Sequence, residues 1–165
     1  MINNAIKILI YITKFIPHKI KHPVAVWVFN KLVVTTKPIT ASSKQDVGIT
    51  TILCHEHVYF YLLSIKSFFH FSKLNLPVFV VGDGSLTQKD VFLLKKHVRN
   101  IKILKGKEAE KTIFAKLQPY PFCLRYRKET HPKLWNHNKK LFDPLLLSGF
   151  KRFILLDADV IFFNE

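Results

Sequence analysis

Two carboxylates separated by one residue follow an apolar run close to the end of the sequence. Asp157 and Asp159 come after residues 153–156 and before a second apolar run at 160–163. In extended backbone, residues two apart point to the same side, so the two side chains would repel each other unless a cation lies between them. Mg²⁺ or Mn²⁺ suits such a pair, because these hard cations bind carboxylates and fill their other positions with water or phosphate oxygens. The pattern predicts a divalent metal site. The alternative is a solvated turn at a strand end, which the apolar flanks disfavour.

The elements that must position these acids are predicted by an alternation of β-rich and helical runs from Val47 onward. This alternation is typical of an α/β domain with a parallel sheet, in which ligands bind at the carboxyl ends of the strands. We expect buried strands at residues 48–54, 77–81, 101–104 and 153–156, and helices at residues 55–71, 87–98 and 137–147. A capping box at residues 87–90 begins the second helix. The last helix could instead start at Asp143 and Pro144, as an N-cap and a first helical residue. Residues 105–135, which contain three prolines, are expected to be the least regular.

Composition limits the class of protein. The chain has 165 residues, 48% of them hydrophobic, which is enough for one compact core and excludes a disordered or low-complexity chain. Cys54 and Cys123 are too far apart for a CxxC motif, which argues against a thiolate zinc site or a disulfide scaffold and fits a reducing compartment. The formal net charge of +15 favours a polyanionic partner, whether nucleic acid, phospholipid or a phosphate-bearing ligand.

The first 45 residues form a distinct basic segment, because the first acidic residue is Asp46. From Met1 to about Lys21, basic and apolar residues recur on different helical faces. The apolar runs are too short to cross a bilayer, and no signal-peptide cleavage site is present. Two interpretations remain open: an interfacial helix on an anionic membrane, with Trp27 and Phe29 as anchors, or a helix packed on the domain. We therefore divide the chain into a basic amphipathic helical segment, 1–45, and an α/β domain, 46–165.

The last strand resembles a known enzyme family. Phe-Ile-Leu-Leu-Asp-Ala-Asp-Val-Ile-Phe-Phe at 153–163, preceded by Asn-Lys-Lys-Leu-Phe-Asp-Pro-Leu at 138–145, resembles the GT-A-fold glycosyltransferases, particularly the glycogenin-like and bacterial lipopolysaccharide galactosyltransferase group. The resemblance covers about residues 47–165. It implies a Rossmann-like nucleotide-sugar-binding sheet with flanking helices that is truncated after the Asp-x-Asp strand. Only the donor-binding half would then be present, and no catalytic residue is assigned within this chain.

The resemblance also assigns roles around the Asp-x-Asp. In the family, these acids bind a divalent cation that bridges the diphosphate of a nucleotide sugar, and the first acid also approaches the ribose. By likeness, Asp157 and Asp159 bind Mn²⁺ or Mg²⁺, and Asp157 also contacts substrate. A lysine at the start of the preceding helix reaches the donor in the family, and Lys140 takes that position here. A positive charge beside a pyrophosphate is favourable on electrostatic grounds.

Four further residues are implied to bind the nucleotide. Cys54 and His55 would lie at the end of the first strand, where the family holds the base. His57 would take the place of an aromatic residue that is usually Tyr, and Asp83, in Gly-Asp-Gly-Ser, would meet the base or ribose. Helix capping by this Cys54-His-Glu-His cluster, and a plain glycine-bearing turn at Asp83, remain alternatives. A zinc site in the cluster is disfavoured because it lacks His-Glu-x-x-His spacing.

The implied reaction is transfer of a sugar from a nucleoside diphosphate sugar, with a UDP-sugar favoured, to a saccharide or lipid-linked acceptor of envelope polysaccharide synthesis. The resemblance leans toward retention of anomeric configuration. A cytoplasmic protein peripheral to the inner membrane face is expected, with no nucleic-acid partner. One alternative is a non-catalytic basic module that binds nucleic acid or membrane, motivated by the net charge and by residues 125–128. Another is a haloacid-dehalogenase-like phosphatase, although Val160 and Ile161 follow the acids where that family has Gly-Thr.

Overall fold

The chain divides into two compact units, Met1–Lys37 and Pro38–Glu165. The computed structural model describes residues 18–43, 46–129 and 137–163. The boundary expected after residue 45 falls within the second unit, because β1 (Ile39–Thr40) pairs with β4 (Val98–Arg99). No local sequence pattern predicts this pairing, because the two segments are short and far apart in the sequence.

The described part of the first unit is one helix, α2 (His18–Thr35). Its apolar side chains are distributed around the helix, and Pro23 lies inside it. Trp27 is exposed, with the Lys31 ammonium 5.8 Å from the centre of its ring. Among the described helices, none combines the length and the apolar character needed to cross a membrane. The amphipathic helix expected from Met1 to about Lys21 lies almost entirely outside the described residues, so the interfacial helix stays a prediction.

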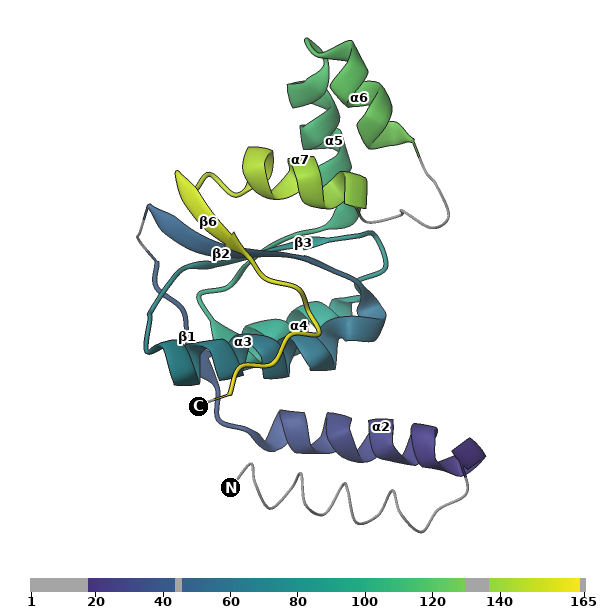
Figure 1. Ribbon diagram of the computed structural model, residues 1–165, viewed down its shortest axis with the longest axis vertical. Helices are drawn as coiled ribbons and strands as arrows, with labels where there is room; N and C mark the ends of the chain where they lie inside the picture. Colours follow the sequence, from purple (N-terminus) through teal and green to yellow (C-terminus); the bar gives the residue numbers. More distant parts are fainter. Residues whose placement is uncertain (1–17, 44–45, 130–136, 164–165) are drawn as a thin grey trace. The chain divides into compact units, whose positions relative to one another are not determined.

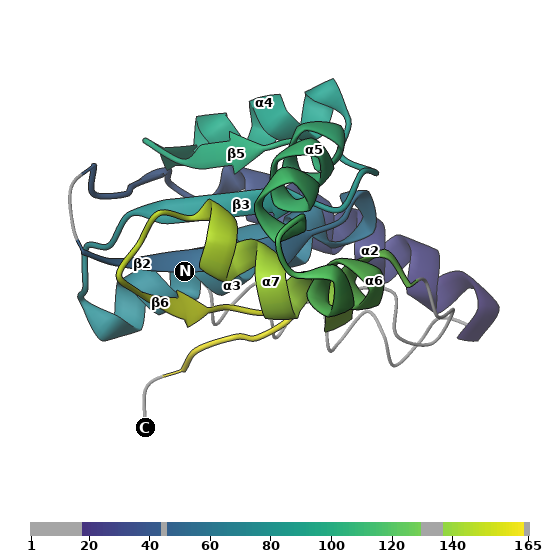
Figure 2. The ribbon, with the colours of Figure 1, turned by 90° about the horizontal axis from the view of Figure 1, so that it is seen from above.

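The second unit is built on a four-stranded parallel sheet with strand order β5-β3-β2-β6 (Figures 1 and 2). The strands are β2 (Val47–Leu53), β3 (Val78–Gly82), β5 (Lys102–Leu104) and β6 (Arg152–Leu155). The expected α/β class with a parallel sheet is confirmed. Each predicted strand agrees with the observed one to within a residue at either end, because continuous apolar runs in a parallel sheet are easily recognised.

Helices cover both faces of this sheet (Figure 1). One face is covered by α3 (Val58–Ser72), which follows a short 3₁₀ turn, η1 (His55–His57), and by α4 (Gln88–His97). The other face is covered by α5 (Gly106–Leu117) and α7 (His137–Leu147), and α6 (Pro121–Lys128) packs against these two helices. The core is therefore formed on both sides of β2 and β3, whose residues are almost all buried.

The capping box is confirmed, whereas two helix predictions are wrong. The Thr87 side chain accepts a hydrogen bond from the Asp90 amide at 3.2 Å, and the Asp90 carboxylate accepts one from the Thr87 amide at 2.7 Å.

The alternative start of the last helix at Asp143 is wrong, since α7 runs from His137 through Pro144. The expectation of irregular structure over 105–135 is also wrong, because this region contains α5 and α6. Pro121 begins α6, where the missing amide hydrogen of proline costs nothing, because the first amides of a helix have no partner within the helix.

The prediction that the last strand is buried is wrong. Ile154 and Leu155 are 37% and 41% exposed. Within the described residues, β6 pairs with β2 on one side only and is an edge strand of the sheet. An apolar run alone does not distinguish a central strand from an edge strand, because the neighbours that bury it are set by topology.

An ion pair between α6 and α7 generates a prediction about stability. Arg127 donates two hydrogen bonds to the carboxylate of Asp143, at 2.7 and 2.8 Å, and both side chains are buried. We expect Asp143→Ala to lower the free energy of unfolding by about 3–5 kcal/mol, because it leaves a buried guanidinium without a counter-charge. Urea denaturation measures this change.

The matched control is an exposed pair of the same kind. Lys151 and Asp46 form an ion pair at 3.0 Å with both side chains exposed, so Asp46→Ala should cost at most about 1 kcal/mol. Equal losses in the two variants would show that the Arg127 pair has no special structural role.

Candidate functional site

The carboxyl ends of three adjacent strands meet at one edge of the sheet, because β3, β2 and β6 are parallel neighbours. The sequence-predicted residues follow these ends directly: Asp83 comes after β3, Cys54 and His55 after β2, and Asp157 shortly after β6. Ligands of open α/β sheets bind at this edge, in the crevice beyond the strand ends. We refer to these residues, with the first turn of α7, as the carboxyl edge.

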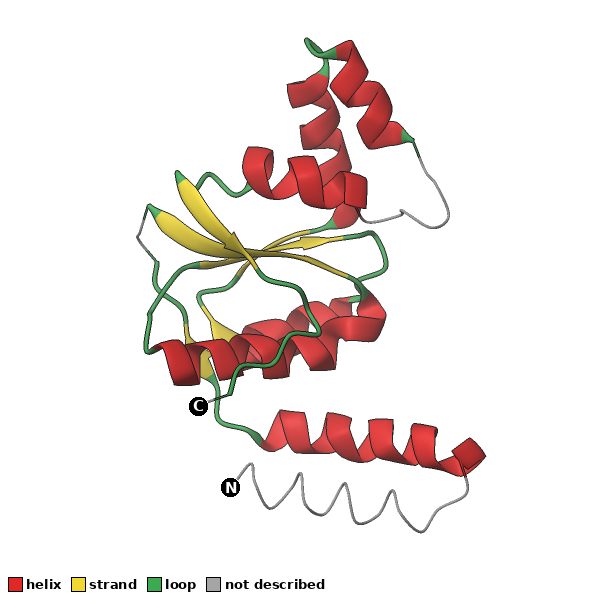
Figure 3. Ribbon diagram, in the orientation of Figure 1, coloured by secondary structure: helices red, strands yellow, loops and turns green. Residues whose placement is uncertain are grey.

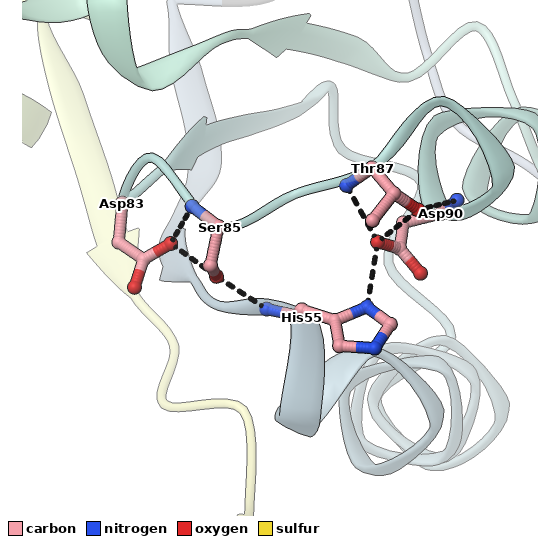
Figure 4. A network of polar contacts seen from close by, with 5 residues as sticks. All are labelled: His55, Asp83, Ser85, Thr87 and Asp90. Atoms are coloured by element: carbon pink, nitrogen blue, oxygen red, sulfur yellow. Dashed lines mark hydrogen bonds and ion pairs between the residues drawn. The ribbon is translucent and has the colours of Figure 1, made fainter.

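The ends of β2 and β3 are joined by a network of hydrogen bonds (Figure 4). The amide and hydroxyl of Ser85 both donate to Asp83 Oδ1, at 2.8 and 2.7 Å, which folds the turn after β3. The His55 amide donates to Ser85 Oγ at 2.8 Å, and the Asp83 amide donates to the Leu53 carbonyl at 3.0 Å. The glycine-bearing turn predicted at Asp83 is thus also the contact that holds the two strand ends together.

This turn packs closely against the start of α5. Gly84 has φ +118°, a conformation that favours glycine, and a Cβ on Gly106 would lie 2.5 Å from the Gly84 Cα. Both positions therefore exclude a side chain, one because of its backbone conformation and the other because of the approach of the turn. The result is a turn after β3 whose path is set by backbone contacts.

His55 is oriented by Asp90, a residue that sequence analysis assigned only to the capping box. His55 Nδ1 lies 2.8 Å from Asp90 Oδ2, which also accepts hydrogen bonds from the amide and hydroxyl of Thr87, each at 2.7 Å. Burial by itself would raise the pKa of Asp90, but the hydrogen bonds from Thr87 and His55 outweigh it and hold this pKa below its ordinary value. Asp90 is thus ionised at neutral pH and can only accept, so Nδ1 of His55 carries a hydrogen and donates a hydrogen bond to this carboxylate. The other ring nitrogen points away from the network and remains accessible (Figure 4).

Consecutive lysines in the first turn of α7 reach two different strand ends. Lys139 Nζ donates to the carbonyl of Asp83 at 2.7 Å, and Lys140 Nζ donates to Asp157 Oδ1 at 2.5 Å. Lys139 is buried, whereas the ion pair of Lys140 is partly exposed. Lys140 thus lies beside Asp157. A role for Lys139 was not predicted from the sequence. Only one lysine was expected to contact a ligand, and adjacent residues on a helix do not face each other.

The Asp-x-Asp segment does not continue the strand. β6 ends at Leu155, and Ala158 and Asp159 lie in a turn, so the assumption of extended backbone is wrong. Both carboxylates are nevertheless exposed, because Leu156 and Ala158 take the buried positions.

The backbone of the segment that contains the two acids is attached to β2 and α3 by four hydrogen bonds: Leu156 N to Thr50 O, Thr51 Oγ1 to Leu156 O, Ser64 Oγ to Asp157 O, and Phe162 N to Ser67 Oγ. Two small residues of α3 therefore allow the segment to approach the helix.

Metal binding at the edge depends on few protein ligands. In the parts of the chain that the structure describes, no group of three or more His, Cys, Asp or Glu residues could hold a metal ion. Asp157 and Asp159 could supply two carboxylates, and water or substrate oxygens would complete the shell. This is the ligand supply typical of Mg²⁺ and Mn²⁺ at phosphate-binding sites.

His57 and Cys54 do not join the network. His57 is the N-cap residue of α3, but its side chain makes no capping hydrogen bond, and its ring lies edge-on to Phe60 with 6.3 Å between centroids. The side chain of Cys54 does not cap η1 either. Helix capping by these two side chains is therefore wrong, and a contact with a nucleotide stays a prediction for both.

Comparison of the chain with family models, with curated proteins and with solved structures gave no match. Function is therefore inferred from the geometry of the carboxyl edge and from the residues that the sequence places there.

The depressed pKa of Asp90 predicts a specific response to acid. Asp90 stabilises the folded state at pH values above its unfolded pKa of about 3.9, and this contribution is lost as the pH falls through its lower folded pKa. We expect Asp90→Asn to be less stable than the parent at pH 7 and to lose stability less steeply as the pH falls below about 4. Urea denaturation at a series of pH values measures both profiles, and parallel profiles would contradict the assignment.

Proposed function

We propose that the carboxyl edge binds a nucleoside diphosphate sugar and that the second unit is the donor-binding part of a GT-A-type glycosyltransferase. The observation that carries the proposal is the Lys140–Asp157 contact, which brings a cation on α7 to the acid after β6. A partly exposed lysine, two exposed carboxylates and the end of a parallel sheet together form a surface suited to a diphosphate and a divalent cation.

The two exposed acids are the candidate ligands of the expected metal. Asp157 and Asp159 would hold Mn²⁺ or Mg²⁺, which would supply positive charge to the diphosphate leaving group. Lys140 would then exchange its contact with Asp157 for a phosphate oxygen. This exchange costs little, because a partly exposed ion pair contributes at most about 1 kcal/mol.

The neighbouring strand ends offer contacts for the rest of the nucleotide. The accessible ring nitrogen of His55 accepts a hydrogen bond when the ring is neutral, since Asp90 holds the proton on Nδ1. Asp83 uses Oδ1 for its own turn, and its second oxygen points away from the turn in Figure 4. These two groups suit the base or ribose of the donor, with Cys54 and His57 at its margin.

The rest of the proposal follows from the resemblance. The donor would be a UDP-sugar, and a hexosyl group would pass to a saccharide or lipid-linked acceptor in polysaccharide synthesis at the cytoplasmic face of a membrane. The groups that complete catalysis are not assigned to residues of this chain.

Binding of UDP tests the proposal directly. Isothermal titration calorimetry should detect UDP binding in the presence of Mn²⁺ and its loss on addition of EDTA. Asp157→Ala and Asp159→Ala should reduce binding to the EDTA level. Lys140→Met should weaken binding by about tenfold or more, because a hydrogen bond to a charged group is worth about 1.5–3 kcal/mol.

A matched pair at the opposite edge of the same strands provides the control. Asp46 and Lys151 precede β2 and β6, and their ion pair is exposed. Asp46→Ala and Lys151→Met remove the same charges from the sheet without touching the carboxyl edge, so they should bind UDP as the parent does. Metal-independent UDP binding, or salt-sensitive binding of random oligonucleotides in its place, would refute the proposal and favour a basic binding module.

A further inference from the structure

The connection between α5 and α6 exposes several apolar side chains in succession. Pro119, Tyr120, Pro121 and Phe122 are all exposed, and Phe122 is 77% exposed. The connection lies at the end of the α5–α6 hairpin that is directed away from the sheet (Figure 3). We refer to residues 119–122 as the hairpin tip. Contiguous exposed apolar residues of this kind usually mark a contact surface.

The tip is held in place by backbone hydrogen bonds and by a buried ion pair between α6 and α7. The Tyr120 amide donates to the Leu117 carbonyl at 2.9 Å, and the Leu124 amide donates to the Tyr120 carbonyl at 2.9 Å. The buried Arg127–Asp143 ion pair attaches α6 to α7. Because the tip cannot fold back onto the domain without breaking these bonds, its apolar side chains stay in solvent.

Positive charge lies beside the tip. The Arg125 guanidinium is 5.8 Å from the centre of the Phe122 ring, and Lys128 is exposed one turn of α6 further on. Glu129 is the acidic residue on this surface, 3.7 Å from Arg125. An open hollow of about 400 Å³ lies next to the tip, lined by Gln118, Pro121, Leu124, Arg125, Lys128 and Glu129.

We infer that the hairpin tip binds an anionic phospholipid surface. Aromatic and apolar side chains at a protruding tip enter the headgroup region, and adjacent basic side chains attract anionic headgroups. The hollow beside Arg125 and Lys128 has room for a phosphate-bearing headgroup. Single-stranded nucleic acid fits less well, because it binds in basic grooves in which successive bases stack on aromatic rings, rather than on a protruding tip.

A second exposed aromatic residue provides a matched control. Phe92 on α4 is 69% exposed and is followed by the exposed Lys95 and Lys96. The helix α4 lies on the opposite face of the sheet from α5 and α6 (Figure 1), and Val91, the sequence neighbour of Phe92, is buried. Phe92 therefore has the same side-chain chemistry as Phe122 without a continuous apolar tip.

Tryptophan fluorescence reports which of the two positions enters a bilayer. Phe122→Trp and Phe92→Trp are made in the full chain, and the signal of the parent, which contains Trp27 and Trp135, is subtracted. With vesicles of phosphatidylcholine and phosphatidylglycerol, the F122W signal should shift to shorter wavelength and be quenched by brominated lipid. The F92W signal should not change, and vesicles of phosphatidylcholine alone should produce little effect.

Charge substitutions test the electrostatic part in vesicle co-sedimentation. Arg125→Gln and Lys128→Gln should each weaken binding to phosphatidylglycerol vesicles by about fivefold, since one basic residue contributes about 1 kcal/mol near an anionic surface. Glu129→Gln should strengthen binding, and added salt should weaken it.

Several outcomes would overturn the inference. One is a chain that does not sediment with anionic vesicles, and another is a bound chain whose F122W signal is unchanged. Quenching of F92W in place of F122W would assign the contact to α4. A response of F122W to a single-stranded oligonucleotide but not to vesicles would assign the tip to nucleic acid. Because none of these measurements involves UDP or Mn²⁺, they are independent of the proposed donor site.

Discussion

The parallel pairing of β2 with β3 on one side and β6 on the other holds three strand ends beside one another. The contacts that join different strand ends at the carboxyl edge depend on this pairing. It places Asp83, His55 and Asp157 just after three neighbouring strands. The first turn of α7 then contacts the segments that follow β3 and β6. Lys139 binds the carbonyl after β3 and Lys140 binds the acid after β6, so a shift of either strand would separate at least one of these pairs.

The ion pairs of the molecule divide according to burial, and this division separates structure from recognition. Arg127 and Asp143 are buried and form two hydrogen bonds, so removing either charge leaves the other without solvation or a partner. Lys140 and Asp157 are partly exposed, and water can replace either partner at small cost. The proposed binding of a diphosphate and a cation would need contacts of the second kind, because the acid and the base would both have to change partners.

The two proposed surfaces would bind their partners through different kinds of interaction. The carboxyl edge uses hydrogen bonds and charges that are oriented by backbone structure, as the His55–Asp90 contact shows. The hairpin tip combines exposed apolar area with exposed positive charges, which suits a partner without a fixed shape. The strong positive charge of the chain is favourable for both, since each proposed partner is anionic.

Much of this fold could be predicted from the sequence, because local patterns determine local elements. Apolar runs located β2, β3 and β6, and Thr87 with Asp90 marked the start of α4 through hydrogen bonds between residues three apart. The positions of Asp83, Asp157 and Lys140 relative to strand and helix ends were likewise predictable. The helical region after residue 105 was missed because prolines were taken as breaks, although Pro121 stands where a helix tolerates proline.

What only the tertiary structure decided are the contacts between residues far apart in the chain. The sequence could not show that Asp90 orients His55, that Lys139 binds the turn after β3, or that Ser64 and Ser67 receive the segment containing Asp157. Nor could it show that β6 is exposed and that Ala158 begins a turn. The physical reason is that periodicity and capping are properties of neighbouring residues, whereas burial and these long-range hydrogen bonds depend on which strands and helices pack together.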